Sequence, residues 1–178
     1  MSKKIWFTGC THYGHKNIIK LSNRPFSDIE QHDDILINNY NKLVSSDDTC
    51  YFLGDFAWNQ SFENYKRLFS RLNGKKFFVL GNHDNRQNII KCKKEGLLID
   101  VFENKTIQIG SNKIYLSHFP HREWNCFYHN AYHLYSHCHG NIEDYKQSTD
   151  IGVDCWEYEP VEWSEVKEYI DKNCEINI

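Results

Sequence analysis

The sequence contains no apolar stretch of the roughly 20 residues that a membrane-spanning helix needs. Its first apolar run ends at Gly9, so no signal peptide is expected there. It has no Cys-x-x-Cys pair, and its seven cysteines are scattered and odd in number, which argues against a disulfide framework and favours a cytoplasmic protein. It also lacks a long Lys/Arg run and carries a net charge of -3, so nothing indicates duplex nucleic acid or a membrane as a partner.

No linker, internal repeat or low-complexity segment divides the 178 residues, so a single domain over residues 1–178 is expected. Charged residues make up 25% of the chain, which is near the average for globular proteins, so the composition does not indicate disorder. Histidine, by contrast, is abundant. Six of the ten histidines lie between His118 and His139, and this crowding is the first indication of a functional site.

The first half of the chain predicts alternating strands and helices. Three apolar runs, each rich in aromatic or β-branched residues, predict buried strands: Ile5 to Thr8, Tyr51 to Leu53 and Phe77 to Leu80. Helices are expected over about Asp28 to Val44, with a capping box of Ser27 and Glu30, and over about Phe62 to Leu72, before Gly74. This alternation predicts a parallel sheet with helical crossovers.

The second half is mainly β in character. Two runs flank the turn Gly110-Ser111-Asn112 and predict a hairpin: Thr106 to Ile109 and Lys113 to Ser117. Further strands are expected over Tyr132 to Ser136 and Ser148 to Val153, and a short last helix over Ser164 to Asp171. An α/β fold with two packed sheets flanked by helices accommodates both halves.

Potential metal ligands follow directly after five of the predicted strands. In chain order they are Cys10 and His12; Asp55; Asn82, with His83 and Asp84; His118; and His137 with His139. In α/β sheets, sites form at the carboxyl ends of strands, so these segments are expected to converge. Imidazole and carboxylate groups suit Zn, Fe, Mn, Co or Ni. A single Gly-Asp or His-x-His occurs in many ordinary turns and strands, but the ordered set predicts a metal centre.

These motifs resemble the calcineurin-like metallophosphoesterase superfamily, whose order is Asp-x-His, Gly-Asp, Gly-Asn-His-Asp or -Glu, a His after a strand, and Gly-His-x-His. The matching segments here are Cys10-x-His12, Gly54-Asp55, Gly81 to Asp84, His118, and Ser136 to His139. The resemblance runs from residue 5 to about Asp154. It is strongest to short, single-domain bacterial and phage members, in which segments like Phe7 to Ile19 and Asn23-Arg24-Pro25-Phe26 occur.

The resemblance implies a two-sheet mixed β-sandwich flanked by helices, of the metallo-dependent phosphatase type. It also implies two divalent transition-metal ions, drawn from Mn, Zn, Fe or Ni. The first would take Cys10, His12, Asp55 and His139, and the second Asp55, Asn82, His118 and His137. A bridging carboxylate such as Asp55 tolerates two cations roughly 3.5–4 Å apart and helps to trap a bridging hydroxide, the implied nucleophile.

His83 is implied to be catalytic rather than a ligand. An imidazole can donate a proton to the leaving oxygen as a general acid at neutral pH. Asp84 is expected to hold the other ring nitrogen and keep the ring cationic. The alternative is that His83 only stabilises its turn.

Four further residues are candidates for substrate binding, each with an ordinary alternative. His15 is expected to line the pocket or bind phosphate, or else to cap a helix that begins near Asn17. Arg24 is a candidate phosphate clamp or a surface residue. His121 and Arg122, just past His118, are candidates to face the substrate. Nearby aromatic residues, Trp124, Phe127 and Tyr128, either stack on a base or simply pack.

The chain departs from the superfamily at its first ligand, where Cys10 replaces Asp. A thiolate suits Zn or Fe but favours Mn poorly. Two rival hypotheses follow: a weakened or inactive member that serves as a metal- or protein-binding scaffold, and a hydrolase with a Cys10 nucleophile. The second leaves the remaining His and Asp residues unexplained.

The predicted function is therefore metal-dependent hydrolysis of a phosphoester. A small phosphodiester or a nucleotide is the favoured substrate, because the net acidic chain argues against long nucleic acid and its short length leaves little room for a capping domain. Phosphomonoesters and cyclic nucleotides use the same kind of site. Neither the metals nor the oligomeric state follow from the sequence.

Overall fold

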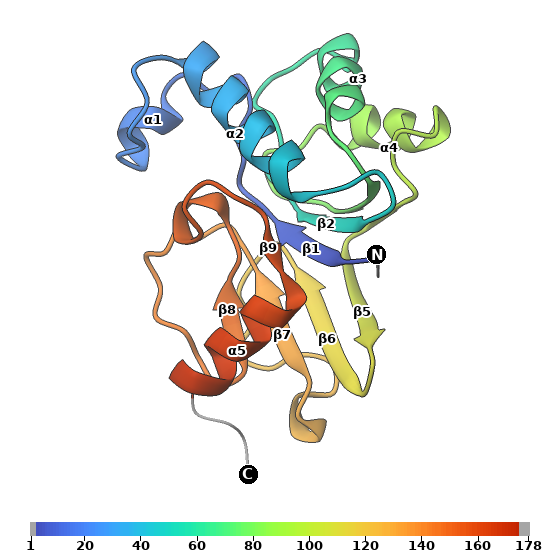
Figure 1. The fold of residues 1–178 in the computed structure, drawn as a ribbon, viewed down its shortest axis with the longest axis vertical. Helices are drawn as coiled ribbons and strands as arrows, with labels where there is room; N and C mark the ends of the chain where they lie inside the picture. Colours follow the sequence, from blue (N-terminus) through green and yellow to red (C-terminus); the bar gives the residue numbers. More distant parts are fainter. Residues whose placement is uncertain (1–2, 175–178) are drawn as a thin grey trace.

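The structure is a computed structural model that describes residues 3–174, so both ends of the domain predicted over 1–178 lie outside the described residues. Its first sheet has five strands in the order β4-β3-β2-β1-β9. Of these, β1, β2 and β9 are labelled in Figure 1. Their bounds are β1 (Ile5–Thr8), β2 (Thr49–Leu53), β3 (Lys75–Val79), β4 (Asp100–Phe102) and β9 (Val161–Glu162). Strands β1 to β4 are parallel, and β9 runs antiparallel to β1.

The second sheet has four strands in the order β5-β6-β7-β8. Their bounds are β5 (Asn104–Ile109), β6 (Asn112–Ser117), β7 (Tyr132–Tyr135) and β8 (Ser148–Asp150). Ile109 pairs with Asn112 across the turn Gly110-Ser111, which confirms the predicted hairpin. Strands β6, β7 and β8 are parallel, so both sheets are mixed and both present several carboxyl strand ends.

Side chains that alternate along the first sheet build two hydrophobic clusters. Phe52 and Phe78 pack with three helices, α2 (Ile29–Leu43), α3 (Phe62–Arg71) and α4 (Arg86–Lys94). Leu53 and Val79 pack instead with the second sheet and with α5 (Trp163–Asn173). The first sheet thus lies between a helical layer and the second sheet. The remaining elements are α1 (Ile18–Leu21) and two short 3-10 helices, η1 (Phe127–His129) and η2 (Val153–Cys155).

The predicted fold class, an α/β arrangement of two mixed sheets flanked by helices, is confirmed. The local cap of α2 differs from the prediction. Asp28, not Ser27, is the N-cap, and its side chain accepts from the backbone N–H of Gln31 (2.8 Å). Gln31 in turn accepts from the backbone N–H of Ser27, so the residue expected to cap the helix lies just outside it.

Helix α4, strands β4 and β9 and the two 3-10 helices were not predicted. Helix α4 buries only Ile89 and Cys92, which is too short an apolar stripe to stand out in the sequence. Strands β4 and β9 have three and two residues, and they form because β3 and β1 offer them a partner. Such pairing is a tertiary effect that local sequence does not encode.

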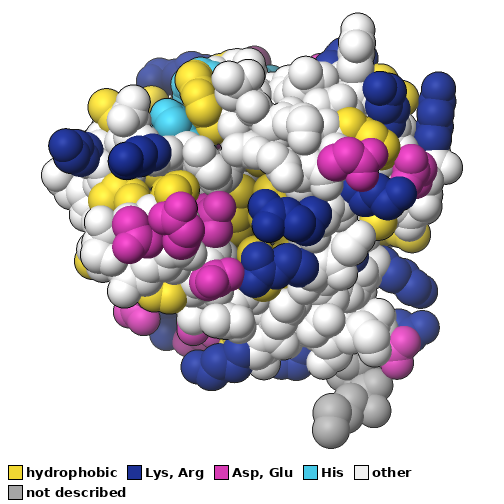
Figure 2. Space-filling view, turned by 90° about the horizontal axis from the view of Figure 1, so that it is seen from above, with side chains coloured by type: hydrophobic (Ala, Val, Ile, Leu, Met, Phe, Trp, Pro, Cys, Tyr) yellow, Lys and Arg dark blue, Asp and Glu magenta, His cyan; other side chains and the backbone are white. Residues whose placement is uncertain are grey.

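Acidic and basic side chains are interspersed on the face that carries the helices, with histidine visible at one edge (Figure 2). None of the helices within residues 3–174 is both long enough and apolar enough to cross a membrane.

Candidate metal centre

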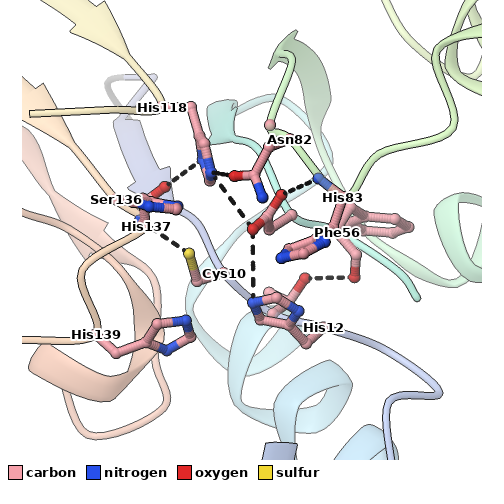
Figure 3. A network of polar contacts seen from close by, with 12 residues as sticks. Cys10, His12, Phe56, Asn82, His83, His118, Ser136, His137 and His139 are labelled. Carbon is pink, nitrogen blue, oxygen red and sulfur yellow. Dashed lines mark hydrogen bonds and ion pairs between the residues drawn. The ribbon is translucent and has the colours of Figure 1, made fainter.

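The seven predicted metal ligands come from loops at the ends of five strands in both sheets (Figure 3). These residues are Cys10 and His12 after β1, Asp55 after β2, Asn82 after β3, His118 after β6, and His137 and His139 after β7. The parallel strands of each sheet end at the same edge, and the two sheets face each other. The fold therefore brings together residues up to 129 positions apart in the sequence (10 to 139).

One group within this cluster consists of Cys10, His12 and His139. One potential ligand atom from each lies within 4.8 Å of the other two. The imidazoles of His12 and His139 stack with ring centroids 5.2 Å apart. Both ring nitrogens of His12 are buried without a hydrogen-bond partner among the described residues. Burial lowers the pKa of His12 to about 3, so the ring is neutral and has a lone pair ready for a cation.

A second group forms around His118. Its Nδ1 donates to the carbonyl oxygen of Leu53 (2.8 Å), which directs the lone pair of Nε2 toward Asn82 Oδ1 at 2.8 Å and Asp55 Oδ2 at 3.4 Å. Three acceptor atoms then meet, and they are compatible only if a proton or a metal ion lies between them. Burial lowers the pKa of His118, but the neighbouring Asp55 carboxylate outweighs it and leaves that pKa raised.

Asp55 lies between the two groups. Its Oδ2 is 3.8 Å from Nε2 of His12 and 3.4 Å from Nε2 of His118, and its Oδ1 accepts from the backbone N–H of His83 (2.9 Å). Burial raises the pKa of Asp55, yet the neighbouring His118 and the bond from the backbone N–H of His83 outweigh it and bring the pKa to about 2. The carboxylate is therefore ionised and available to cations on both sides.

Cys10 is fully buried at the centre of the cluster, and its sulfur accepts from the backbone N–H of His137 (3.0 Å). One potential ligand atom from each of Cys10, Asp55 and His118 also lies within 4.8 Å of the other two, so the thiol is near the second group as well as in the first. Burial and the Asp55 charge raise the pKa of the Cys10 thiol well above its ordinary value. A bound cation would reverse this, because coordination deprotonates a thiol.

The backbone around the cluster is strained. Positive φ angles, between 50° and 77°, occur at five of the seven predicted ligands: Cys10, His12, Asp55, His137 and His139. Such conformations are uncommon for residues other than glycine and tend to gather at functional sites. Gly81 supports the same packing, because a Cβ there would lie 2.3 Å from Asp55 Oδ1.

A family model of the calcineurin-like phosphoesterases matches residues 3–171 of the chain. The chain belongs to this family. The family implies metal-dependent hydrolysis of phosphoric esters, and the cluster supplies candidate ligands for its divalent metals. The unpartnered nitrogens of the buried His12 show that these residues fit such ions.

Relatives of this chain occur in an archaeon and in a bacteriophage. "Uncharacterized protein MJ1445" of Methanocaldococcus jannaschii is 29% identical, with 96% of this chain and 93% of that protein covered. "Gene 66 protein" of Mycobacterium phage L5 is 27% identical, and the match covers 85% of this chain and 86% of that protein. Among solved structures, this chain is similar to AQ665 from Aquifex aeolicus, described as a protein of unknown function. The TM-score is 0.74 and the identity 25%, and the match covers 95% of this chain and 100% of the AQ665 chain.

His83, the residue predicted to act as general acid, is exposed beside the cluster. Its ring lies 5.9 Å from that of His12 and 4.7 Å from that of Trp58, measured between centroids. Trp58 was not predicted as a site residue. It is 37% exposed and stacks on His15 (4.3 Å, 10°), so one indole contacts both histidines. Its only signal in the sequence is its position three residues after Asp55.

His15 lies at the rim of the cluster, 5.5 Å from His12 between ring centroids, and its Nδ1 is buried without a hydrogen-bond partner. Burial lowers the pKa of His15. The alternative of a helix cap does not hold, because α1 has no side-chain capping bond.

Asp84 does not bond His83 as expected. Its carboxylate accepts from the backbone N–H groups of Gly81 (2.8 Å), Asp55 (2.9 Å) and Phe56 (2.9 Å). Both oxygens are thus engaged by backbone, so Asp84 fixes the loop of Asp55 against that of Gly81. The prediction that it holds the second nitrogen of His83 is corrected accordingly.

The structure also corrects the substrate-binding role predicted for Arg24. Its side chain is fully buried, and the guanidinium pairs with Asp154 and with backbone carbonyls, so no donor points toward solvent. Sequence reasoning missed Asp154 because the two partners are 130 residues apart.

His121 and Arg122 line a pocket of about 430 Å³ whose walls include none of the seven predicted ligands. The guanidinium of Arg122 lies over the ring of Tyr145 (4.6 Å). His121 packs against His133, which is buried between the hydroxyls of Ser117 and Ser148. Of the nearby aromatic residues, Trp124 and Phe127 are buried in a small hydrophobic cluster, which favours a packing role for both, and Tyr128 is exposed.

Proposed function

We propose that this chain is a metal-dependent phosphoester hydrolase that acts on a small phosphodiester or a nucleotide. Cys10, His12, Asp55 and His139 would hold one divalent ion, and Asp55, Asn82, His118 and His137 a second. The observation that carries the proposal is the pair of buried His12 ring nitrogens, which have no hydrogen-bond partner among the described residues. The contact of His118 Nε2 with Asn82 Oδ1 and Asp55 Oδ2 supports it, since a cation can take the place of a proton there. Such an arrangement is stabilised by a bound cation.

When bound, a pair of divalent ions supplies an activated water at neutral pH and neutralises charge on the phosphoryl oxygens. The chain's own residues do the rest. His83 is exposed at the rim, where its imidazole can protonate the leaving oxygen. Its backbone N–H bonds Asp55 (2.9 Å), so the proposed acid and the central ligand are held in one unit.

The substrate class rests on what surrounds this acid. Asn82 and His83 are both exposed, so the leaving group would extend into open space. Trp58 offers a partly exposed indole beside His83, and a flat leaving group such as an aryl ring or a base would pack on it. His15 stacks on the same indole and is the remaining candidate to contact the phosphoryl group.

A panel of nitrophenyl phosphate, bis(nitrophenyl) phosphate and cyclic nucleotides, each with Mn, Zn, Ni or no added metal, tests the proposal. Chelator-treated protein should be inactive, and added metal should restore hydrolysis, with diesters turned over better than the monoester. Tight metal binding without turnover of any ester would contradict the proposal and favour the scaffold hypothesis. The replacement of the first Asp ligand by Cys10 is the feature of the sequence that supports that hypothesis.

A further inference from the structure

One buried ion pair lies directly behind half of the metal centre. The guanidinium of Arg24 bonds the carboxylate of Asp154 at two points, Nε to Oδ1 at 2.8 Å and Nη2 to Oδ2 at 2.7 Å. The side chain of Arg24 is 0% exposed and that of Asp154 only 7%. Burying both charges costs desolvation energy, and such pairs often stabilise a fold little. Its contacts therefore matter more than its contribution to stability.

Two further donors of Arg24 hold the loop that carries the first two ligands, and another, on Nη1, contacts Nε2 of His32 (2.7 Å). Nη2 donates to the carbonyl oxygen of Cys10 (2.7 Å) and Nη1 to that of Thr11 (3.1 Å). Both Cys10 and His12 have positive φ angles, of 51° and 53°, so this loop needs outside support. The planar guanidinium supplies it in a geometry that a lysine ammonium could not reproduce.

Asp154 extends the same network to the third ligand. Its Oδ2 accepts from Nδ1 of His139 at 2.6 Å. A proton on Nδ1 leaves Nε2 of His139 with a free lone pair, and that ring faces His12 and Cys10 (Figure 3). A carboxylate in this position fixes both the tautomer and the ring orientation of a histidine ligand.

The other half of the centre has no such pair. His118 is oriented by the carbonyl of Leu53 and the hydroxyl of Ser136, and neither Arg24 nor Asp154 bonds any of Asn82, His118 or His137 in the contacts described here.

We propose that Arg24 and Asp154 are positioning residues of the first metal site alone, holding the Cys10–His12 loop and the His139 ring in one geometry. The proposal rests on the proposed function, since it assumes that these three residues bind a metal. It also explains why Arg24, which follows the first ligands by only a dozen residues, is buried instead of facing the substrate.

The test is a titration of the intact chain with cobalt. Calorimetry measures the affinity of each binding step, and the near-ultraviolet thiolate-to-cobalt absorption band reports whether Cys10 binds the metal. Three variants are compared with wild type: Arg24→Met, Asp154→Ala and the milder Asp154→Asn. Arg71→Met is the matched control, because Arg71 pairs with Asp34 (2.7 Å) on the exposed surface. Asn82→Ala, which removes a ligand proposed for the second site only, assigns the two binding steps.

Loss of an outer-shell partner typically costs roughly 10–100-fold in metal affinity, so we expect that loss at the first step, with a weaker thiolate band and an unchanged second step. Arg71→Met should match wild type. If circular dichroism shows that Arg24→Met does not fold, Asp154→Asn provides the test. It should weaken the first binding step by a smaller factor and leave the second step unchanged.

Equal weakening of both steps, or two unchanged steps in the variants, would overturn the positioning role while leaving the proposed function intact. A wild-type chain that binds no cobalt would overturn the proposed function, and the positioning role with it.

Discussion

The two proposed halves of the metal centre differ in their ligands and in what supports them. Cys10, His12 and His139 are backed by the buried Arg24–Asp154 pair and include a thiol. The other proposed half, which includes Asn82 and His118, has only nitrogen and oxygen ligands. There the ring of His118 is oriented by the carbonyl of Leu53 and the hydroxyl of Ser136. Soft sulfur favours Zn or Fe, whereas oxygen and nitrogen accept harder ions such as Mn. The comparison predicts two sites with different metal preferences.

Asp55 is the residue that both halves share, so its removal should have the largest effect. We expect Asp55→Ala to weaken both metal-binding steps by more than the roughly 10–100-fold that loss of an outer-shell partner costs. Hydrolysis should fall to the level of chelator-treated protein. Calorimetry with Mn and Zn measures this, with Asp47→Ala, an exposed aspartate, as the control. Loss of one step only would show that Asp55 serves a single half.

His83 separates chemistry from metal binding. His83→Ala should lower turnover by roughly 10²–10⁴-fold, the usual range for an acid–base group, while metal content stays unchanged. The loss should shrink with a nitrophenolate leaving group, which needs little protonation. Steady-state kinetics and metal analysis provide the measurement, and the exposed His129→Ala is the control. Loss of metal in His83→Ala would make His83 a ligand instead of an acid.

Cys10 is the residue that makes the halves unequal. Cys10→Asp should bring the first half closer to the second by raising Mn affinity about tenfold, equivalent to about 1.4 kcal/mol. The gain should be smaller for Zn, because hard oxygen suits Mn better than sulfur does. Cys126→Asp, away from the cluster, controls for added charge. Identical Mn titrations for Cys10→Asp and wild type would mean that Cys10 does not contact the metal.

The smallest expected effect is at Trp58, on the rim of the cluster. Trp58→Ala should raise KM for nitrophenyl diesters by roughly 2–10-fold, as expected for an aromatic contact worth about 0.5–1.5 kcal/mol. A dialkyl phosphate should be hydrolysed as by wild type. Tyr128, 77% exposed, provides the matched aromatic control. An equal change for aryl and alkyl substrates would assign Trp58 to the support of His83 rather than to substrate binding.

Much of this centre could be predicted because strand ends are local features. Apolar runs followed by glycine marked β1, β2 and β3, and ligands placed just after them had to meet at one edge of the sheet. The roles of Arg24 and Asp84 could not be predicted, because they depend on partners far along the chain or on backbone N–H groups. Asp154 lies 130 residues from Arg24, and Asp84 bonds a loop 29 residues away.

The central claim is that the cluster holds two metal ions, one in each half. Anomalous diffraction from crystals grown with Zn and Mn, recorded at both absorption edges, tests it most directly. We predict two peaks flanking Asp55, the Zn peak stronger beside Cys10, His12 and His139, and the Mn peak stronger beside Asn82, His118 and His137. No peak at the cluster with either metal, in protein whose fold is intact, would contradict the account.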